Sequence, residues 1–306
     1  MTVRLERLTI RYGNRTAVDD LTVDFVDGCV GLLGRNGAGK SSVLKALLGL
    51  VRPSAGSMRF TDLPADASAA RIRAHVGYMP EREAYLPQAT GFDMVAMLGM
   101  VSGLQRRPAW RRAHEVLYLV GLDEQRYRPV AGYSAGMRQK VKLAAALVHD
   151  PQVLFLDEPT NGLDPLGRRE MLALVRQLKR ELRKSIVFST HILQDVEAVC
   201  DAAVVLEAGR VVAQGDLQQL TQGTELEYRV HVERDTEMLA TALQELGRAV
   251  AHGGGRYSVW LPDEAHTASL FAAAATHGAI VRSLRLQRRS LEDVFLTAVR
   301  GGGSGE

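Results

Sequence analysis

A glycine-rich stretch has the residue types and spacing that bind phosphate, following the pattern Gly-x-x-x-x-Gly-Lys-Ser. Its glycines let successive backbone N–H groups turn into one hollow that attracts anions. Lys40 adds a mobile positive charge for the β- and γ-phosphates, and the Ser41 hydroxyl is a ligand for Mg²⁺. The pattern predicts a phosphate-binding loop made of Gly34, Arg35, Asn36, Gly37, Ala38, Gly39, Lys40, Ser41 and Ser42.

Two acidic residues, Asp157 and Glu158, directly follow the apolar run 153–156, which predicts a buried strand. A carboxylate at the carboxyl end of a buried parallel strand faces the ligand crevice. We therefore predict that Asp157 holds the Mg²⁺ bound by Ser41, and that Glu158 orients the attacking water or accepts its proton. Without a phosphate loop upstream, such a pair would as readily begin a solvated helix.

Two further residues are candidates because of their positions. His191 follows the predicted strand 185–189, as Asp157 follows its strand; a single histidine is more often structural, but this placement favours a role in the site. Tyr12 lies in a predicted turn at residues 11–14, where its ring is either an ordinary turn side chain or a platform for a base.

These residues require a sheet whose strands end at one edge. Apolar runs predict an antiparallel pair at 3–10 and 21–25, and further strands at 29–33, 57–60, 76–79, 153–156 and 185–189, with a hairpin at 203–212. Helical periodicity predicts helices at 43–48, 92–122, 137–147 and 167–182. Ser134 is the expected N-cap of the third helix. The stretch 92–122 is then a helical insert between two strands of one sheet.

The chain changes character near residue 221. From there the pattern predicts strand, helix, strand, strand, helix and strand, followed by a helix at 291–299. This order is typical of a ferredoxin-like domain and contains no catalytic cluster. We expect a nucleotide-binding domain at 1–220 with a helical subdomain at about 90–150, an accessory or regulatory domain at 224–299, and a flexible tail at 300–306.

Composition narrows the function classes. The chain has 306 residues, 46% of them hydrophobic, and a net charge of +3, which is too small to argue for nucleic acid binding. Its two cysteines suggest no disulfide framework and fit a reducing compartment. No apolar run reaches the roughly 18 residues that a membrane span needs. We therefore expect a soluble protein whose membrane role, if it has one, comes through a partner.

With these motifs in order, residues 1–220 resemble the nucleotide-binding subunit of an ATP-binding cassette (ABC) transporter. Tyr12 matches the adenine-stacking aromatic, Asp157 and Glu158 the magnesium-holding and catalytic acids, and His191 the switch histidine of that family. Asp164 matches the loop that contacts the other subunit. The family signature is matched at two positions, Ser134 and Gly136, within the segment Tyr133, Ser134, Ala135, Gly136 and Met137. This form of the signature resembles the exporter branch with ABC-2-type permeases, as does the ending 290–296.

The resemblance implies a homodimer that binds ATP and Mg²⁺ at two shared sites. Ser134 and Gly136 precede a helix N-terminus, which is an anion site, and the resemblance implies that they complete the nucleotide site of the opposite subunit. An isologous pair satisfies this with one gene product. The signature residues Ser134 to Met137, including Ala135, and Asp164 are therefore predicted nucleotide contacts.

One residue departs from the family pattern. Glu81 stands where the family usually has glutamine, so it either contacts Mg²⁺ differently or helps a loop dock on the permease. The overall expectation is an α/β P-loop NTPase with a mixed sheet, a helical insert and a small α+β domain.

The function that the resemblance implies is ATP hydrolysis that powers export through an ABC-2-type permease at the cytoplasmic face of the membrane. Two alternatives stay open at this point. A soluble, non-transport ABC-type ATPase usually carries two cassettes or a long coiled coil, and this chain has neither. A P-loop kinase is disfavoured by the signature, the Asp164 loop and His191. The cargo is open, because its contacts would lie in the permease.

Overall fold

The computed structural model describes residues 2–82, 85–221, 226–234, 237–287 and 291–294. It divides the chain into two compact units, Met1–Leu217 and Gln218–Thr297. Each unit has its own hydrophobic core. No helix in these ranges is both long and apolar enough to cross a bilayer.

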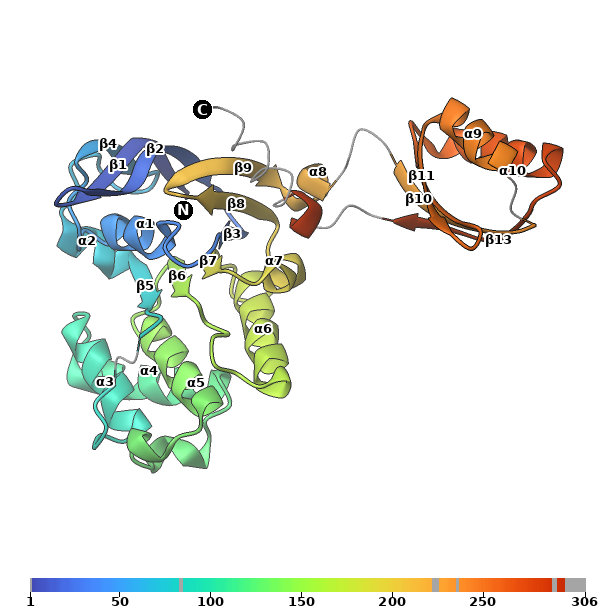
Figure 1. Cartoon of the computed structure of the whole chain (residues 1–306). Coiled ribbons are helices and arrows are strands. Elements are labelled where there is room, and N and C mark those ends of the chain that lie inside the picture. Colours follow the sequence, from blue (N-terminus) through green and yellow to red (C-terminus); the bar gives the residue numbers. More distant parts are fainter. Residues whose placement is uncertain (1, 83–84, 222–225, 235–236, 288–290, 295–306) are drawn as a thin grey trace. The chain divides into compact units, whose positions relative to one another are not determined.

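The first unit is built around a six-stranded sheet with the order β5-β6-β7-β3-β8-β9 (Figure 1). All neighbours pair in parallel except the last pair, β8 and β9. The strands are β3 (Cys29–Leu33), β5 (Val76–Met79), β6 (Val153–Asp157), β7 (Ser185–Thr190), β8 (Ala202–Glu207) and β9 (Arg210–Asp216). Every residue of β3, β6 and β7 is buried, because strands of a parallel sheet are covered on both faces. Their carboxyl ends therefore bring the phosphate loop, Asp157 and Thr190 to one edge.

A second, antiparallel sheet has the order β2-β1-β4. Its strands are β1 (Val3–Tyr12), β2 (Arg15–Phe25) and β4 (Ala55–Phe60). Helix α1 (Lys40–Leu47) shares one core with both sheets, since Leu8, Leu44 and Phe155 belong to the same cluster. The two-residue turn at Gly13 and Asn14 is shorter than predicted, so Tyr12 ends a strand instead of lying in the turn.

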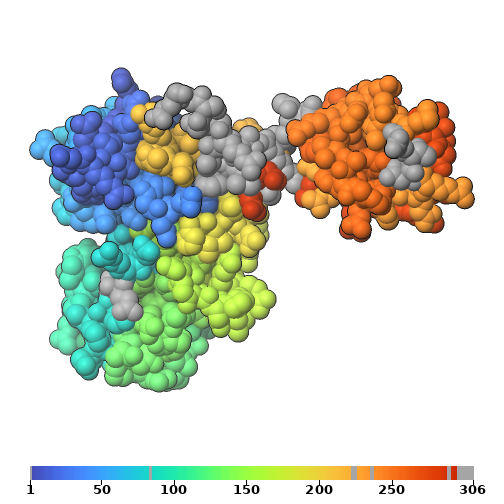
Figure 2. Space-filling model, viewed as in Figure 1, coloured from blue at the N-terminus to red at the C-terminus, as the bar shows by residue number. Residues whose placement is uncertain are grey.

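The middle of the first unit's sequence forms a helical lobe, coloured teal to green at the bottom of Figure 2. It contains α3 (Gly91–Val101), α4 (Arg106–Leu119) and α5 (Ala135–Leu147). The predicted helical insert at 92–122 is confirmed between β5 and β6, and it consists of two helices that are separated after Val101, where Gly103 has a φ of +101° that few residues other than glycine adopt. Helix α2 (Ala69–His75) was not predicted, because it buries none of its residues and has no apolar face to detect.

Two helices follow the strands of the site. They are α6 (Pro165–Arg180) and α7 (Leu193–Val199), and the short α8 (Leu217–Thr221) comes after β9. Helix α6 begins two residues before the predicted start because Asp164 caps it, with its Oδ1 accepting from Gly167 N at 2.7 Å. The two cysteines are free thiols whose sulfur atoms lie 3.4 Å apart.

The second unit has the predicted order of strands and helices. It consists of β10 (Leu226–Glu233), α9 (Glu237–Leu246), β11 (Arg248–Gly253), β12 (Arg256–Leu261), α10 (Thr267–Thr276) and β13 (Ile280–Gln287). Its sheet is antiparallel throughout, with the order β11-β12-β10-β13. Residues 291–294 are helical; the rest of the predicted helix 291–299 and the tail at 300–306 lie outside the described residues.

Candidate functional site

A hollow of about 550 Å³ opens beside the phosphate loop. Residues of the loop, of the β1–β2 hairpin, of α1 and of the segments after β5 and β6 meet there. Its lining consists of Tyr12, Arg15, Ala17, Arg35, Asn36, Gly37, Gly39, Lys40, Ser41, Ser42, Lys45, Glu81 and Glu158. The structure thus brings Tyr12, the phosphate loop, Glu81 and Glu158, which are far apart in sequence, around one space.

The backbone of the phosphate loop needs glycine at two positions. Gly37 and Gly39 have φ values of +86° and +106°, which side-chain-bearing residues rarely adopt. A Cβ on Gly39 would also come within 2.6 Å of the Ala17 carbonyl oxygen on β2. The loop therefore curls tightly against the hairpin and leads into α1, whose first residue is Lys40. The N-terminus of α1 adds its dipole to the site.

Lys40 and Glu158 form a buried ion pair. Lys40 Nζ lies 3.3 Å from Glu158 Oε1, and the two side chains are 6% and 4% exposed. The ammonium group also donates to the carbonyl oxygen of Gly34 at 2.6 Å. Glu158 has a φ of +50°, a strained value for this residue type, and its backbone N–H donates to the Ser189 carbonyl at 2.9 Å. The strained turn directs the carboxylate from the end of β6 toward the phosphate loop.

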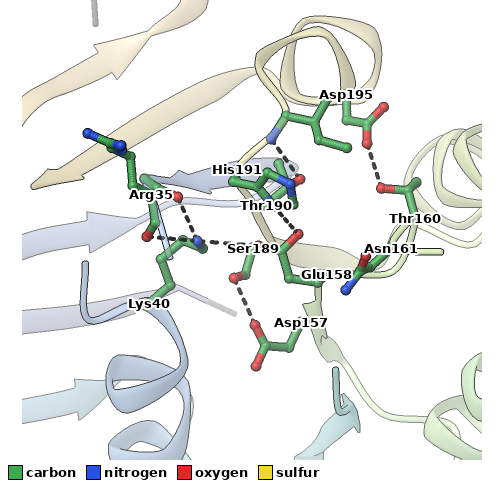
Figure 3. A network of polar contacts seen from close by, with 12 residues as sticks. Arg35, Lys40, Asp157, Glu158, Thr160, Asn161, Ser189, Thr190, His191 and Asp195 are labelled. Carbon is green, nitrogen blue, oxygen red and sulfur yellow. Dashed lines mark hydrogen bonds and ion pairs between the residues drawn. The ribbon is translucent and has the colours of Figure 1, made fainter. Parts of the chain in front are cut away.

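His191 holds the other oxygen of the same carboxylate. Its Nδ1 lies 2.9 Å from Glu158 Oε2 (Figure 3). The imidazole is 42% exposed while the carboxylate is buried, so the histidine lies between Glu158 and solvent. Lys40, Glu158 and His191 form one continuous line of charged and polar groups, drawn from α1 and from the ends of β6 and β7.

Asp157 lies beside this line at the end of β6 and is buried. Ser189 Oγ donates to Asp157 Oδ1 at 2.9 Å, because the parallel register places Ser189 opposite Asp157. Burial, and then the charge of Asp157, raises the pKa of Tyr78 on the neighbouring strand, so its phenol stays protonated. Sequence reasoning missed Ser189 and Tyr78, although a polar residue within a buried strand was a signal for each.

Carboxylate and hydroxyl oxygens of the kind that Mg²⁺ prefers are present. The described residues contain no group of three or more His, Cys, Asp or Glu that would cage a metal. Ser41 lines the hollow, whereas the buried Asp157 is not one of its lining residues. Two oxygen donors of this kind would fit a magnesium ion that takes its remaining ligands from nucleotide phosphates and water, which is usual for this ion. Glu81, the third predicted metal contact, is exposed on the lining of the hollow.

Lys142 connects the helical lobe to the segment that contains Glu81. Its Nζ, on α5, donates to the carbonyl oxygens of Pro80 and Glu81 at 2.7 and 3.0 Å. Gln139, on the same helix, donates to the Asn161 carbonyl at 3.0 Å. The lobe is therefore hydrogen-bonded to the segments that follow β5 and β6.

The signature residues lie at a different place on the chain. Ser134 caps α5, with its Oγ accepting from Met137 N at 3.2 Å, which confirms the predicted cap. Ser134 is exposed, and Ala135, Gly136 and Met137 form the first turn of α5. None of these residues, nor Asp164, lines the hollow. The structure therefore does not bring the predicted signature contacts to the same space as the phosphate loop.

A buried carboxylate that the sequence did not reveal joins three parts of the site. Asp195, in α7, is completely buried. Its Oδ2 accepts from Thr160 Oγ1 and its Oδ1 from Arg168 Nε, each at 2.6 Å. Asp195 thereby ties the turn after Glu158 and the start of α6 to the helix after His191. An acid in a seven-residue helix looks like a solvated side chain, so no local pattern pointed to it.

Known proteins are similar to this chain in sequence. A family model described as ABC transporter matches residues 18–161. The ABC transporter ATP-binding protein YxlF of Bacillus subtilis (strain 168) is 34% identical over 299 residues, which cover 96% of this chain and 98% of that protein. The Nod factor export ATP-binding protein I of Ralstonia nicotianae is 34% identical, covering 95% of this chain and 92% of the relative. The bacitracin transport ATP-binding protein BcrA of Bacillus licheniformis is 29% identical, covering 99% of each.

Solved structures agree with the sequence relatives. The structure of cbiO1 from Clostridium perfringens, part of the ABC transporter complex cbiONQ, is 28% identical and has a TM-score of 0.64 over 71% of this chain and 89% of that one. A dimeric cassette, MJ0796 bound to ADP and Pi, has the same fold, with a TM-score of 0.64 at 22% identity over 70% of this chain and 98% of its own. Relatives above 30% identity along nearly the whole chain establish the family. The chain is therefore an ATP-binding, ATP-hydrolysing subunit of the ABC transporter family.

Proposed function

We propose that this chain powers export through an ABC-2-type permease, to which it binds as a homodimer at the cytoplasmic face of the membrane. The observation that carries the proposal is the contact of the buried Lys40–Glu158 pair with the exposed His191 at the carboxyl ends of the parallel strands. It gives one chain a phosphate-binding cation and an oriented carboxylate base. Two relatives with whole-length similarity are named for the export of Nod factor and the transport of bacitracin.

The geometry supports a sequence of contacts in hydrolysis. Lys40 exchanges Glu158 for the β- and γ-phosphates when ATP enters the phosphate loop. The Glu158 carboxylate is then free to accept a proton from a water molecule as the water oxygen bonds to the γ-phosphorus and the bond to the ADP oxygen breaks. His191 keeps the carboxylate oriented by holding its Oε2. Ser41 and Asp157 would hold the magnesium ion, which neutralises charge on the phosphate oxygens.

The proposed homodimer is supported by signature residues that do not line the hollow of their own chain. Ser134 and Gly136 lie at the N-terminus of α5, the end of a helix that attracts anions, and neither lines the hollow of its own chain. We propose that this N-terminus binds the γ-phosphate held by the second copy, and that Asp164 contacts that copy beside it. Tyr12, 44% exposed at the rim, stacks on the adenine. ATP then joins two chains, and its hydrolysis releases them.

The helical lobe is the proposed route from the nucleotide to the permease. Lys142 ties α5 to the Pro80–Glu81 segment, which borders the hollow, so a change at the phosphates reaches the lobe through few contacts. The second unit is assigned an accessory, dimer-stabilising or regulatory role, since none of the site residues lies in it. Glu81 either contacts the metal or helps this segment dock on the permease.

Affinity purification from membranes tests the export assignment. The tagged chain, solubilised with detergent from its own cells, should retain a multi-spanning membrane protein, and ATP hydrolysis should need no phosphate acceptor besides water. Recovery of a ribosome or of a repair complex without any membrane protein would contradict the export function. ATP consumption that depends on an added acceptor would instead indicate a kinase.

A further inference from the structure

Arg15 lies at the mouth of the nucleotide hollow, on an element outside the phosphate loop. It is the first residue of β2 and pairs with Tyr12 across the hairpin turn. Its exposed side chain contributes to the lining of the hollow together with Tyr12 and the loop. The hairpin therefore brings one aromatic ring and one guanidinium group to the same rim.

The guanidinium group reaches over the middle of the phosphate loop. Arg15 Nη2 lies 3.8 Å from the position that a Cβ would take on Gly37. Gly37 has no side chain and its φ is +86°, so nothing of its own stands between the arginine and the loop. The guanidinium group therefore lies beside the loop that would bind the phosphates.

The charge of Arg15 is not neutralised by the protein. Arg4 and Arg7, in the neighbouring strand, pair with Asp24 and Asp20. Within the described part of the chain, the Arg15 side chain has neither an ion pair nor a hydrogen bond. Lys40, by contrast, already contacts Glu158 and the Gly34 carbonyl. Arg15 is thus a cation at the rim of the hollow whose guanidinium N–H groups have no acceptor among the described residues.

We propose that Arg15 binds the phosphate chain of the nucleotide, in addition to Lys40. This inference rests on the proposed ATP site. A guanidinium group presents several donors in one plane and pairs with two phosphate oxygens at once, which a lysine does less well. Tyr12 then holds the base and Arg15 the phosphates, so the β1–β2 hairpin clamps both ends of the nucleotide.

Titration with three ligands tests the proposal. Binding of ATP, ADP and adenosine to the full chain is measured by calorimetry for wild type, Arg15→Ala, Arg15→Lys and Arg11→Ala. Arg11 is the matched control, an exposed arginine at the end of β1 that does not line the hollow. Loss of a charge-assisted contact should weaken ATP binding by Arg15→Ala about 10-fold or more. ADP binding should also weaken, adenosine binding should be unchanged, and Arg15→Lys should recover part of the loss.

The controls separate this inference from the function on which it rests. If wild type binds ATP and Lys40→Ala binds it at least about 10-fold more weakly, the site assignment stands. Equal ATP affinity of Arg15→Ala and wild type then overturns the role of Arg15 alone. An equal loss for adenosine and ATP also overturns it, because the arginine would then act on the base. If wild type binds no ATP, the proposed function itself fails. Thermal melting of each variant verifies that the exposed substitution leaves the fold intact.

Discussion

Glu158 and His191 lie 2.9 Å apart although they come from different strands of the central sheet. β6 and β7 are parallel neighbours in register, so the residues that follow them meet at the same edge. The pair places an exposed imidazole against a buried carboxylate, and the carboxylate's other oxygen faces Lys40. The Glu158 side chain thus connects Lys40 of the phosphate loop to His191 in the segment after β7.

Replacing Glu158 by glutamine should separate binding from hydrolysis. Glutamine keeps the shape and still donates or accepts hydrogen bonds, but it cannot take a proton from water. We expect hydrolysis to fall by about 10²–10⁴-fold, the usual contribution of a positioned base, while ATP binding survives. Steady-state ATPase rates and nucleotide titration measure the two effects. A wild-type rate in this variant would rule out Glu158 as the catalytic base.

The same variant should reveal the dimer. With ATP and magnesium, Glu158→Gln should elute as a dimer in size-exclusion chromatography more than wild type does, because ATP stays in both sites. Adding Ser134→Arg should abolish that dimer, since a large side chain at the N-terminus of α5 blocks the anion site offered to the second copy. A Glu158→Gln chain that stays monomeric with ATP bound would mean that the isolated chain does not form the ATP-joined pair.

Lys40→Ala should weaken ATP binding by roughly 10- to 100-fold, the loss expected for a charge-assisted hydrogen bond. It also leaves the buried Glu158 carboxylate without its cation, so the thermal stability of the nucleotide-free chain should fall. Lys40→Met, which keeps most of the apolar stem, serves as the control for packing. Wild-type ATP affinity in Lys40→Ala would be incompatible with the assigned site.

His191→Ala should lower turnover by about 10²-fold with little change in ATP affinity, because the substitution frees the Glu158 carboxylate without touching the phosphate loop. His191→Gln, which can still donate to the carboxylate, should retain more activity than the alanine variant. The comparison is made at saturating ATP. Equal rates in the two variants would show that the hydrogen bond to Glu158 does not contribute to turnover.

Removing residues 224–299 should leave ATP binding intact and change dimerisation or turnover. The two units have separate cores, so the first does not need the second to bury its apolar side chains. A full-length control is Val259→Asp, which places a charge at a fully buried position of the second core. Loss of ATP binding in a truncated chain that remains folded would contradict an accessory role.

Stability should decline in mild acid because of His149. Burial lowers the pKa of this imidazole, whose Nε2 contacts the Val76 carbonyl at 3.2 Å. In the unfolded chain the pKa of His149 is about 6.5. The stabilising contribution of the neutral imidazole is therefore fully present above about pH 6.5. It is lost as the pH falls from there through the lowered pKa of the folded state, because the unfolded chain then binds a proton that the buried imidazole does not. Urea unfolding at several pH values between about 7.5 and 5 should show this decline, and His149→Gln should show less of it.

Local sequence patterns were sufficient to predict a large part of the fold. The glycines and Lys40 of the phosphate loop, the apolar run before Asp157 and the cap at Ser134 are short-range signals, and the corresponding elements lie where they were predicted. Such signals depend on one strand, one turn or one helix terminus, so the amino-acid order alone specifies them. The interruption after Val101 was missed because a single glycine broke an otherwise helical pattern.

Only the tertiary structure decided which of these groups meet. The ion pair of Lys40 with Glu158, the contact of Glu158 with His191 and the burial of Asp195 under Thr160 and Arg168 join residues from separate elements. They depend on the order and register of parallel strands, which come from side-chain packing between elements and not from any one segment's pattern. The sequence determined which chemical groups the chain carries at its strand ends. The sheet determined that these groups form one site, with the exposed Arg15 at its rim.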